Sequence, residues 1–310
     1  MKRFSQLWMR PTAETTRQLP ERQKETDSQR NRESQHLVDK VFEHTVVLIT
    51  GAGSERLTTD SGLGIGQECA RQFALHGCRK LFLVDISLPG LQQTKGMLEK
   101  NQAHAQVELY QGNVAEENSV KRMVAQCVEV YSRLDIACNN AGISGGSART
   151  SDLAVEDFDR LCSVNQLGVF LCEKYELRQM LQQDRSVGDQ RGAIVNVSSI
   201  AGNCIIPTTP AYAASKHAVV ALSRCDALKY AQDGIRVNCV SPSAVWTPMV
   251  SEAGLPQEFL DMGAAQSPVK RYLQPREVAD AILFMASPRA TAILGANLPV
   301  DCGTQLLRSF

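Results

Sequence analysis

The chain has 310 residues, which is enough for one large α/β domain or two small ones with a sizeable buried core. Lysine plus arginine and aspartate plus glutamate each total 33, so no net charge favours nucleic acid or an anionic membrane as a partner, and no apolar run is as long as a membrane span. Ten cysteines lie scattered without a Cys-x-x-Cys pair or metal-ligand spacing, which indicates reduced thiols, an intracellular compartment and no metal site.

Residues 1–40 differ in composition from the rest of the chain. They are rich in Gln, Arg, Glu, Ser and Thr, and nine basic against six acidic residues give a net charge of +3. Such a stretch cannot bury a core, so we expect a polar, disordered extension. The alternative is an organelle-targeting sequence, because Met1–Arg10 is basic and partly apolar. The acids from Glu14 onward are unusual in transit peptides, so we expect a cytoplasmic protein.

From Val41 onward, short apolar runs alternate with amphipathic helical segments. Seven of these runs are predicted strands: Val46–Thr50, Leu81–Asp85, Val107–Gln111, Leu134–Cys138, Ala193–Ser198, Ile235–Val240 and Asn297–Val300. Strands that alternate with helices predict a parallel sheet with helices on both faces. We therefore predict an α/β class protein in which residues 41–310 form a single-domain Rossmann fold, with a doubly wound parallel seven-stranded sheet.

The first predicted strand ends in a glycine-rich turn. Thr50-Gly51-Ala52-Gly53-Ser54 closes the strand, and Gly62-Leu63-Gly64-Ile65-Gly66 begins a helix. Glycines allow a pyrophosphate to approach the backbone, and the amides of a helix N-terminus face the anion. Asp85 ends the second strand, 19 residues after Gly66, where a carboxylate accepts from the adenosine ribose and repels a 2′-phosphate. The sequence therefore predicts a site for NAD rather than NADP.

A candidate for acid–base chemistry follows the fifth strand. Tyr212 and Lys216 lie four residues apart on a predicted helix and so share one face. A nearby ammonium favours the phenolate, and we therefore expect Lys216 to lower the pKa of Tyr212 toward a useful range. Ser199, at the carboxyl end of the strand, is placed to bond a substrate oxygen beside the phenol. This arrangement indicates an oxidoreductase.

Taken together, the motifs of residues 41–310 resemble those of the short-chain dehydrogenase/reductase family. The matching pieces are Thr50-Gly51 with Gly64-Ile65-Gly66, Asn139-Asn140-Ala141-Gly142, Asn165, Ser199, Tyr212 with Lys216, Arg236-Val237-Asn238, and Pro242 with Thr247-Pro248-Met249. The resemblance implies an NAD(P)-dependent oxidoreductase that transfers a hydride between a nicotinamide cofactor and a secondary alcohol or ketone.

The resemblance also implies roles for individual residues. Tyr212 exchanges a proton with the substrate oxygen, Lys216 tunes Tyr212 and bonds the nicotinamide ribose, Ser199 orients the substrate, and Asn165 holds a water in a proton relay. The implied cofactor-binding residues are Gly51, Ser54, Gly64, Ile65, Gly66, Asp85, Asn113, Val114, Asn140, Ala141, Gly142, Tyr212, Lys216, Val245 and Thr247.

The chain departs from the family pattern at the glycine turn. Nine residues, Glu55–Leu63, look inserted between Ser54 and Gly64, and an alternative register places Gly62 and Gly64 at the later glycine positions. Two milder departures are Ser243 and Cys302 where the family has glycine. The insertion leaves a second function open, a dinucleotide-binding sensor or scaffold with impaired catalysis.

Two further regions carry expectations about the substrate and the partners. Val250–Arg271 is expected to close the substrate pocket, and loops of this kind carry specificity. Helices are predicted over Val155–Leu181 and Ala211–Ala231, and the resemblance implies that they pair in a homodimer or homotetramer.

Overall fold

The computed structural model describes residues 40–53, 63–100, 105–186, 189–206, 209–251, 257–265 and 267–308. The predicted N-terminal extension up to residue 39, Ser54, and the predicted insertion except for Leu63 lie outside the described residues. Within the described part, no helix is long and apolar enough to cross a membrane.

Seven parallel strands form one sheet in the order β3-β2-β1-β4-β5-β6-β7. The strands are β1 Val46–Thr50, β2 Lys80–Asp85, β3 Gln106–Gln111, β4 Ile136–Asn139, β5 Gly192–Val197, β6 Ile235–Pro242 and β7 Asn297–Val300. The predicted doubly wound parallel fold is thereby confirmed. Because the strand order reverses between β1 and β4, a crevice opens at their carboxyl ends, where sheets of this kind bind ligands.

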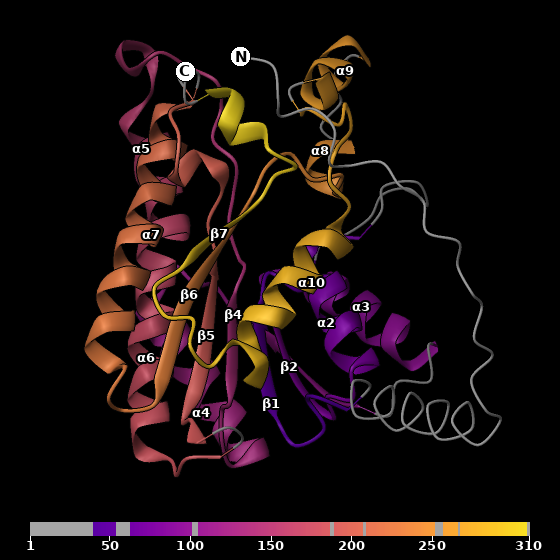
Figure 1. Ribbon diagram of the computed structural model, residues 1–310, viewed down its shortest axis with the longest axis vertical. Helices are drawn as coiled ribbons and strands as arrows, with labels where there is room; N and C mark the ends of the chain where they lie inside the picture. Colours follow the sequence, from indigo (N-terminus) through magenta and orange to yellow (C-terminus); the bar gives the residue numbers. More distant parts are fainter. Residues whose placement is uncertain are drawn as a thin grey trace, which may run out of the picture. The chain divides into compact units, whose positions relative to one another are not determined.

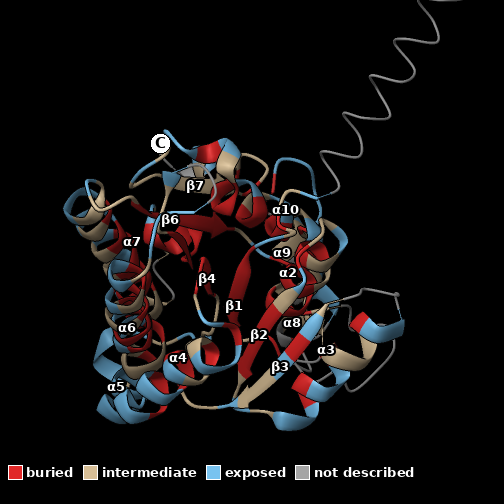
Figure 2. Ribbon diagram, turned by 90° about the horizontal axis from the view of Figure 1, so that it is seen from below, coloured by how far each residue is buried: buried red, intermediate tan, exposed pale blue. Residues whose placement is uncertain are grey.

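Helices cover both faces of the sheet, as Figure 1 shows for α6 and α7 on one side and α2, α3 and α10 on the other. Their bounds are α2 Ile65–Leu75, α3 Leu88–Lys100, α4 Glu117–Tyr131, α6 Gly168–Gln182, α7 Pro210–Tyr230 and α10 Pro275–Ala286. Alternate residues of β1 serve the two faces: Val47 and Ile49 join the core under α2 and α10, and Val46 and Leu48 join the core under α4 and α6. Figure 2 shows β1 and β4 buried between these layers.

The segment predicted as a helix over Val155–Leu181 is helical throughout and contains one π-helical turn. The structure has α5 over Val155–Cys162, a π-helical turn over Ser163–Leu167, and then α6. Asn165 in this turn points inward and bonds the backbone of Ile143, which lies 22 residues earlier in the chain. A π-turn inserts one extra residue and so rotates such a side chain off the regular helical face.

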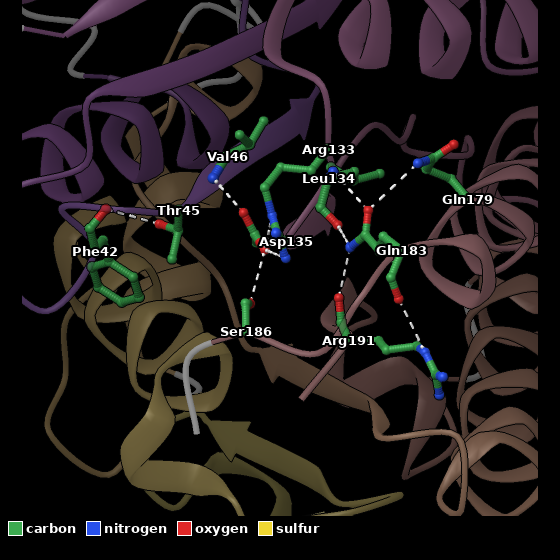
Figure 3. A network of polar contacts seen from close by, with 10 residues as sticks. All are labelled: Phe42, Thr45, Val46, Arg133, Leu134, Asp135, Gln179, Gln183, Ser186 and Arg191. Carbon is green, nitrogen blue, oxygen red and sulfur yellow. Dashed lines mark hydrogen bonds and ion pairs between the residues drawn. The ribbon is translucent and has the colours of Figure 1, made fainter. Parts of the chain in front are cut away.

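A network of polar contacts joins the segments at the amino ends of the strands, opposite the crevice (Figure 3). The Asp135 carboxylate accepts from the backbone N–H of Val46 over 2.9 Å and pairs with Arg133 at 2.7 Å. The Gln183 amide donates to the carbonyl oxygens of Leu134 at 2.6 Å and of Arg191 at 2.7 Å. These bonds tie β1, β4 and the end of α6 together, which leaves the carboxyl ends of the strands as the open edge.

Candidate active site

A cavity of about 630 Å³ lies along the carboxyl ends of the strands. It is lined by predicted site residues from both halves of the sheet: Gly51, Gly64, Ile65, Asp85, Asn113, Val114, Asn140, Ala141, Gly142, Ser199, Tyr212, Lys216, Val245 and Thr247. Among the other predicted site residues, Gly66 and Asn165 are described but do not line it, and Ser54 lies outside the described residues. The cavity therefore extends from the end of β2 to the start of α7.

Ser199, Tyr212 and Lys216 meet at one end of this cavity. The Ser199 hydroxyl accepts from the N–H of Ala201 at 3.1 Å, which fixes its side chain at the start of a short 3-10 turn. The Lys216 ammonium donates to the carbonyl oxygen of Val197 at 2.9 Å and lies 5.7 Å from the centre of the Tyr212 ring. Helix α7 thus presents the phenol and the ammonium to the end of β5.

Burial shifts the pKa values of Tyr212 and Lys216. It raises the pKa of Tyr212 above its ordinary value, and a hydrogen bond with the Ser199 side chain opposes the rise. Burial also lowers the pKa of Lys216 to about 8, with a smaller opposing influence from Cys239. The expectation that the pKa of Tyr212 is lowered is therefore wrong for this structure, because the loss of hydration outweighs the neighbouring groups. At neutral pH the phenol keeps its proton.

The side chain of Asn165 makes three hydrogen bonds to neighbouring segments. It is fully buried, accepts from the N–H of Ile143 at 2.8 Å, and donates to the carbonyl oxygen of Ile143 at 2.9 Å and to the hydroxyl of Ser215 at 3.3 Å. These bonds hold the segment after β4 against α7. The predicted water-holding role of Asn165 is not visible in these contacts, since its amide does not line the cavity.

The glycines at the other end allow close packing of β1 against α2. Gly51 has φ +69°, a left-handed conformation that favours glycine. A Cβ at Gly66 would lie 2.2 Å from the carbonyl oxygen of Gly51, so any side chain there would push α2 away. The Asn140 amide donates to the carbonyl oxygens of Thr50 and Gly51, each at 3.1 Å. The turn is therefore held from two sides, and Gly66 acts through packing.

Asp85 bonds the glycine turn directly. Its carboxylate accepts from the N–H of Gly53 at 2.9 Å and from the N–H of Ser87 at 3.0 Å. A Cβ at Gly53 would lie 2.8 Å from the Asp85 Cβ, so the two segments touch. The next side chain, Ile86, is exposed and apolar. Among the described residues that line the cavity, the end of β2 therefore presents one negative charge and no adjacent positive charge.

Asn113 occupies a tight turn after β3. Its side-chain oxygen accepts from the N–H of Ala115 at 3.0 Å, and its amide donates to Glu116 at 3.0 Å. Val245 and Thr247 lie on the segment after β6, where the N–H of Trp246 donates to the carbonyl oxygen of Leu273 at 2.8 Å. These bonds hold both segments in the wall of the cavity.

The sequence reasoning missed Ser198 as a positioning group. Its buried hydroxyl donates to the carbonyl oxygen of Lys216 at 3.0 Å. A Cβ at Gly202 would lie 2.7 Å from the same oxygen, so the Ser199 loop rests directly on α7. The paired serines at the end of β5 were the signal, but the pattern did not show which partner each hydroxyl takes.

The segment expected to close the pocket contains two short helices. They are α8 over Pro248–Ser251 and α9 over Gln257–Ala265. The Tyr272 hydroxyl donates to the carbonyl oxygen of Leu260 at 2.9 Å, and its ring packs 5.3 Å from that of Trp246. Val250 of α8 lines the cavity.

The chain is similar to known proteins over most of its length. Residues 61–305 match the family model described as Enoyl-(Acyl carrier protein) reductase. Levodione reductase of Leifsonia aquatica is 34% identical over 268 residues, covering 84% of this chain and 94% of the relative. Meso-2,3-butanediol dehydrogenase of Serratia marcescens is 34% identical over 264 residues, covering 84% of this chain and 95% of the relative.

Solved structures show the same likeness. The crystal structure of levodione reductase superposes with a TM-score of 0.78 at 34% identity, covering 86% of this chain and 99% of the other. An actinorhodin polyketide ketoreductase solved with NADPH gives a TM-score of 0.74 at 33% identity, covering 84% of this chain and 97% of the other.

Proposed function

The chain belongs to the short-chain dehydrogenase/reductase family, whose members are NAD(P)-dependent oxidoreductases, and we propose that it interconverts a secondary alcohol and a ketone with NAD(H). One observation carries this proposal: Ser199, Tyr212 and Lys216 line one end of a cavity whose other end is lined by Asp85 and the glycine turn. A sensor that only bound a dinucleotide would have no need of Ser199 and Tyr212 beside Lys216 for proton transfer.

The residues present fit a dinucleotide. The cavity is continuous from Asp85 to Tyr212 and passes the N-terminus of α2, where backbone amides suit a pyrophosphate. Gly142 borders the ammonium, since a Cβ there would lie 3.2 Å from Asn165 Oδ1 and 3.5 Å from the Lys216 nitrogen. Asp85 would bond the adenosine ribose and Lys216 the nicotinamide ribose. The nicotinamide, when bound, supplies or accepts the hydride.

The preference for NAD(H) rests on charge. Asp85 and Lys216 are the charged side chains among the described residues that line the cavity. Asp85 would repel a 2′-phosphate, and Ile86 beside it offers no compensating cation. The actinorhodin ketoreductase solved with NADPH is a relative with the other cofactor, so the preference must be measured for this chain.

The chain's own residues would move the proton. During reduction the Tyr212 hydroxyl donates its proton to the carbonyl oxygen while the carbonyl carbon accepts the hydride, which gives the alcohol. Ser199 donates to the same oxygen and holds it beside the phenol. The Lys216 ammonium lies close enough to favour the phenolate that remains. Oxidation of the alcohol runs through the same contacts in reverse.

A face of exposed apolar side chains supports a homo-oligomer. Phe158 of α5, Phe170 of α6 and Leu228 of α7 are exposed, and Figure 1 shows these helices on the same side of the sheet. We propose that this face pairs with a second copy in a homodimer or homotetramer. Phe170→Glu should then shift the sedimentation coefficient toward that of a monomer.

The ten cysteines are all free thiols, which fits a reducing compartment. We propose a cytoplasmic location on that ground, and imaging of the tagged full chain tests it. We also propose that residues 1–40 form a polar extension and that residues 41–310 form the catalytic domain.

Reduction of ketones by the purified protein with NADH tests the proposed activity. Loss of NADH absorbance in the presence of a ketone, and its return with the product alcohol and NAD, is the expected result. Binding of NADH without turnover of any ketone or alcohol would favour the sensor.

A further inference from the structure

The substrate end of the cavity is poor in positive charge. Among the described residues that line the cavity, Lys216 is the cation, and Asp85 lies at the adenosine end against the glycine turn. The other lining side chains include the hydroxyls of Ser144 and Thr247 and the apolar Val250. Apart from Asp85 and Lys216, the described side chains that line the cavity are therefore uncharged.

Lys216 is poorly placed to pair with a charged substrate. Its side chain is 4% exposed, and its ammonium already donates to the carbonyl oxygen of Val197 at 2.9 Å. In the proposed function its remaining N–H groups face the cofactor ribose. A substrate carboxylate would therefore enter the cavity without a cation of its own, and a buried unpaired charge is strongly unfavourable.

Three segments of the sequence that contain cavity-lining residues carry no base. The sequence contains no Lys, Arg or His over residues 143–148, 199–211 or 243–269, whereas Glu252, Glu258 and Asp261 fall within the last of these. Glu258 and Asp261 lie exposed on α9. Their negative charge would repel an anion that approaches from this side.

Arg149, which follows the first of these segments, is exposed, and the two basic residues that follow the last segment are engaged elsewhere. Arg271 donates to both carboxylate oxygens of Glu277, each at 2.8 Å. Lys270 donates to the carbonyl oxygen of Ala265 at 3.1 Å. Neither bond leaves a guanidinium or ammonium directed at the Tyr212 end.

We infer that the substrate is an uncharged hydroxy or keto compound, with at most further hydroxyl or carbonyl groups, and that keto acids and phosphorylated substrates are excluded. The inference rests on the proposed oxidoreductase function and names the substrate class of that same site. Serine and threonine hydroxyls can bond a neutral second oxygen, whereas a carboxylate would lose its hydration without gaining a counter-ion.

Matched pairs of ketones test this inference. Each pair keeps the reacting carbonyl and differs in charge: 2,3-butanedione against pyruvate, ethyl acetoacetate against acetoacetate, and ethyl benzoylformate against benzoylformate. For any pair of which the protein reduces at least one member, kcat/KM with NADH should be about 100-fold or more higher for the neutral ketone than for the anionic one. The melting temperature of the NADH-bound protein should rise with the neutral member and stay unchanged with the anion.

A charge introduced at the cavity wall provides the gain-of-function test. Val250→Arg places a guanidinium beside the substrate position, and Val250→Gln is the uncharged control. Val250→Arg should raise kcat/KM for the anionic member relative to the neutral one by about tenfold or more. Val250→Gln should leave that ratio unchanged, which separates charge from the loss of the valine.

The two proposals fail in different ways. Preference of the native protein for an anionic member overturns the substrate class and leaves the oxidoreductase function standing. Equal shifts of the ratio by Val250→Arg and Val250→Gln also count against the role of charge. Absence of turnover for both members of every pair, with NADH and with NADPH, overturns the proposed function and the substrate class with it.

Discussion

The hydroxyl of Ser198 donates to the backbone carbonyl oxygen of Lys216 over 3.0 Å, and both side chains are buried. This bond joins the end of β5, which carries Ser199, to the helix that carries Tyr212. A Cβ at Gly202 would lie 2.7 Å from the same carbonyl oxygen, so the loop and the helix are in direct contact. The relative position of Ser199 and Tyr212 therefore depends on Ser198, whose hydroxyl bonds the backbone of α7.

Ser198→Ala should lower kcat more than it changes KM for NADH. The variant loses one buried hydrogen bond, worth about 1 kcal/mol of stability, and also the link between the loop and α7. Thr45→Val is the matched control, because the Thr45 hydroxyl donates to a backbone carbonyl, that of Phe42, at the opposite edge of the sheet (Figure 3). Equal losses of kcat in the two variants would show that Ser198 acts through stability alone.

Two buried carboxyls on α6 predict how stability depends on pH. Burial raises the pKa of Glu173 to about 8 and that of Glu176 to about 7, from an ordinary value of 4.5. Asn196 donates to Glu173 at 2.6 Å and Asn139 donates to Glu176 at 2.9 Å, and Asp226 adds to the rise at Glu173. Both carboxyls also have an oxygen without a hydrogen-bond partner, which favours the protonated form.

The folded chain therefore binds more protons than the unfolded chain between the ordinary pKa of 4.5 and about 8. The free energy of unfolding should fall as pH rises through this window, and the stabilisation is complete only below its lower end. Glu173→Gln and Glu176→Gln should each flatten the decline, since an amide cannot lose the proton. Urea unfolding at several pH values measures it, with the exposed Glu129→Gln as the control. An unchanged slope in both buried variants would contradict the assignment.

Asp85 should decide the choice of cofactor and also support the glycine turn. Asp85→Asn removes the charge and keeps one acceptor for the backbone, and Asp85→Ala removes both. Each should narrow the preference for NADH over NADPH in kcat/KM, because the repulsion of a 2′-phosphate is lost. Only Asp85→Ala should lower the affinity for both cofactors, since the N–H of Gly53 then loses the acceptor that lies 2.9 Å away. A native preference for NADPH would refute the role of Asp85.

Removal of the predicted insertion should strengthen cofactor binding. Deletion of Glu55–Leu63 joins Ser54 to Gly64 and removes the acids Glu55 and Asp60, which Arg56 offsets only in part. Shortening a loop changes its closure entropy by only about 0.6 kcal/mol per doubling of length, so the melting temperature without cofactor should change little. Calorimetric titration with NADH compares the two chains. Tighter binding by the intact chain would mean that the insertion contributes contacts to the cofactor.

The sheet was predictable because its signals are local. β1 and β7 begin and end where their apolar runs do, and α7 spans Pro210–Tyr230 against a predicted Ala211–Ala231. Most predicted site residues line one cavity because the carboxyl ends of parallel strands meet at one edge. Their catalytic and binding roles remain predictions.

What the sequence could not show depends on contacts between distant segments. Asn165 in the π-turn bonds Ile143, which lies 22 residues away in the sequence. The raised pKa of Tyr212 results from burial by surrounding segments, which spacing within one helix does not reveal. The partner of Ser198 likewise depends on how the loop rests on α7.

Turnover by Tyr212→Phe tests the central claim most directly. The substitution keeps the ring and removes only the hydroxyl, so the variant should fold and should still bind NADH by calorimetry. Its kcat for any ketone that the native protein reduces should fall by about 100-fold or more, because no phenolic proton is available. Retention of near-native kcat with that ketone would contradict the assignment of Tyr212 as the proton donor.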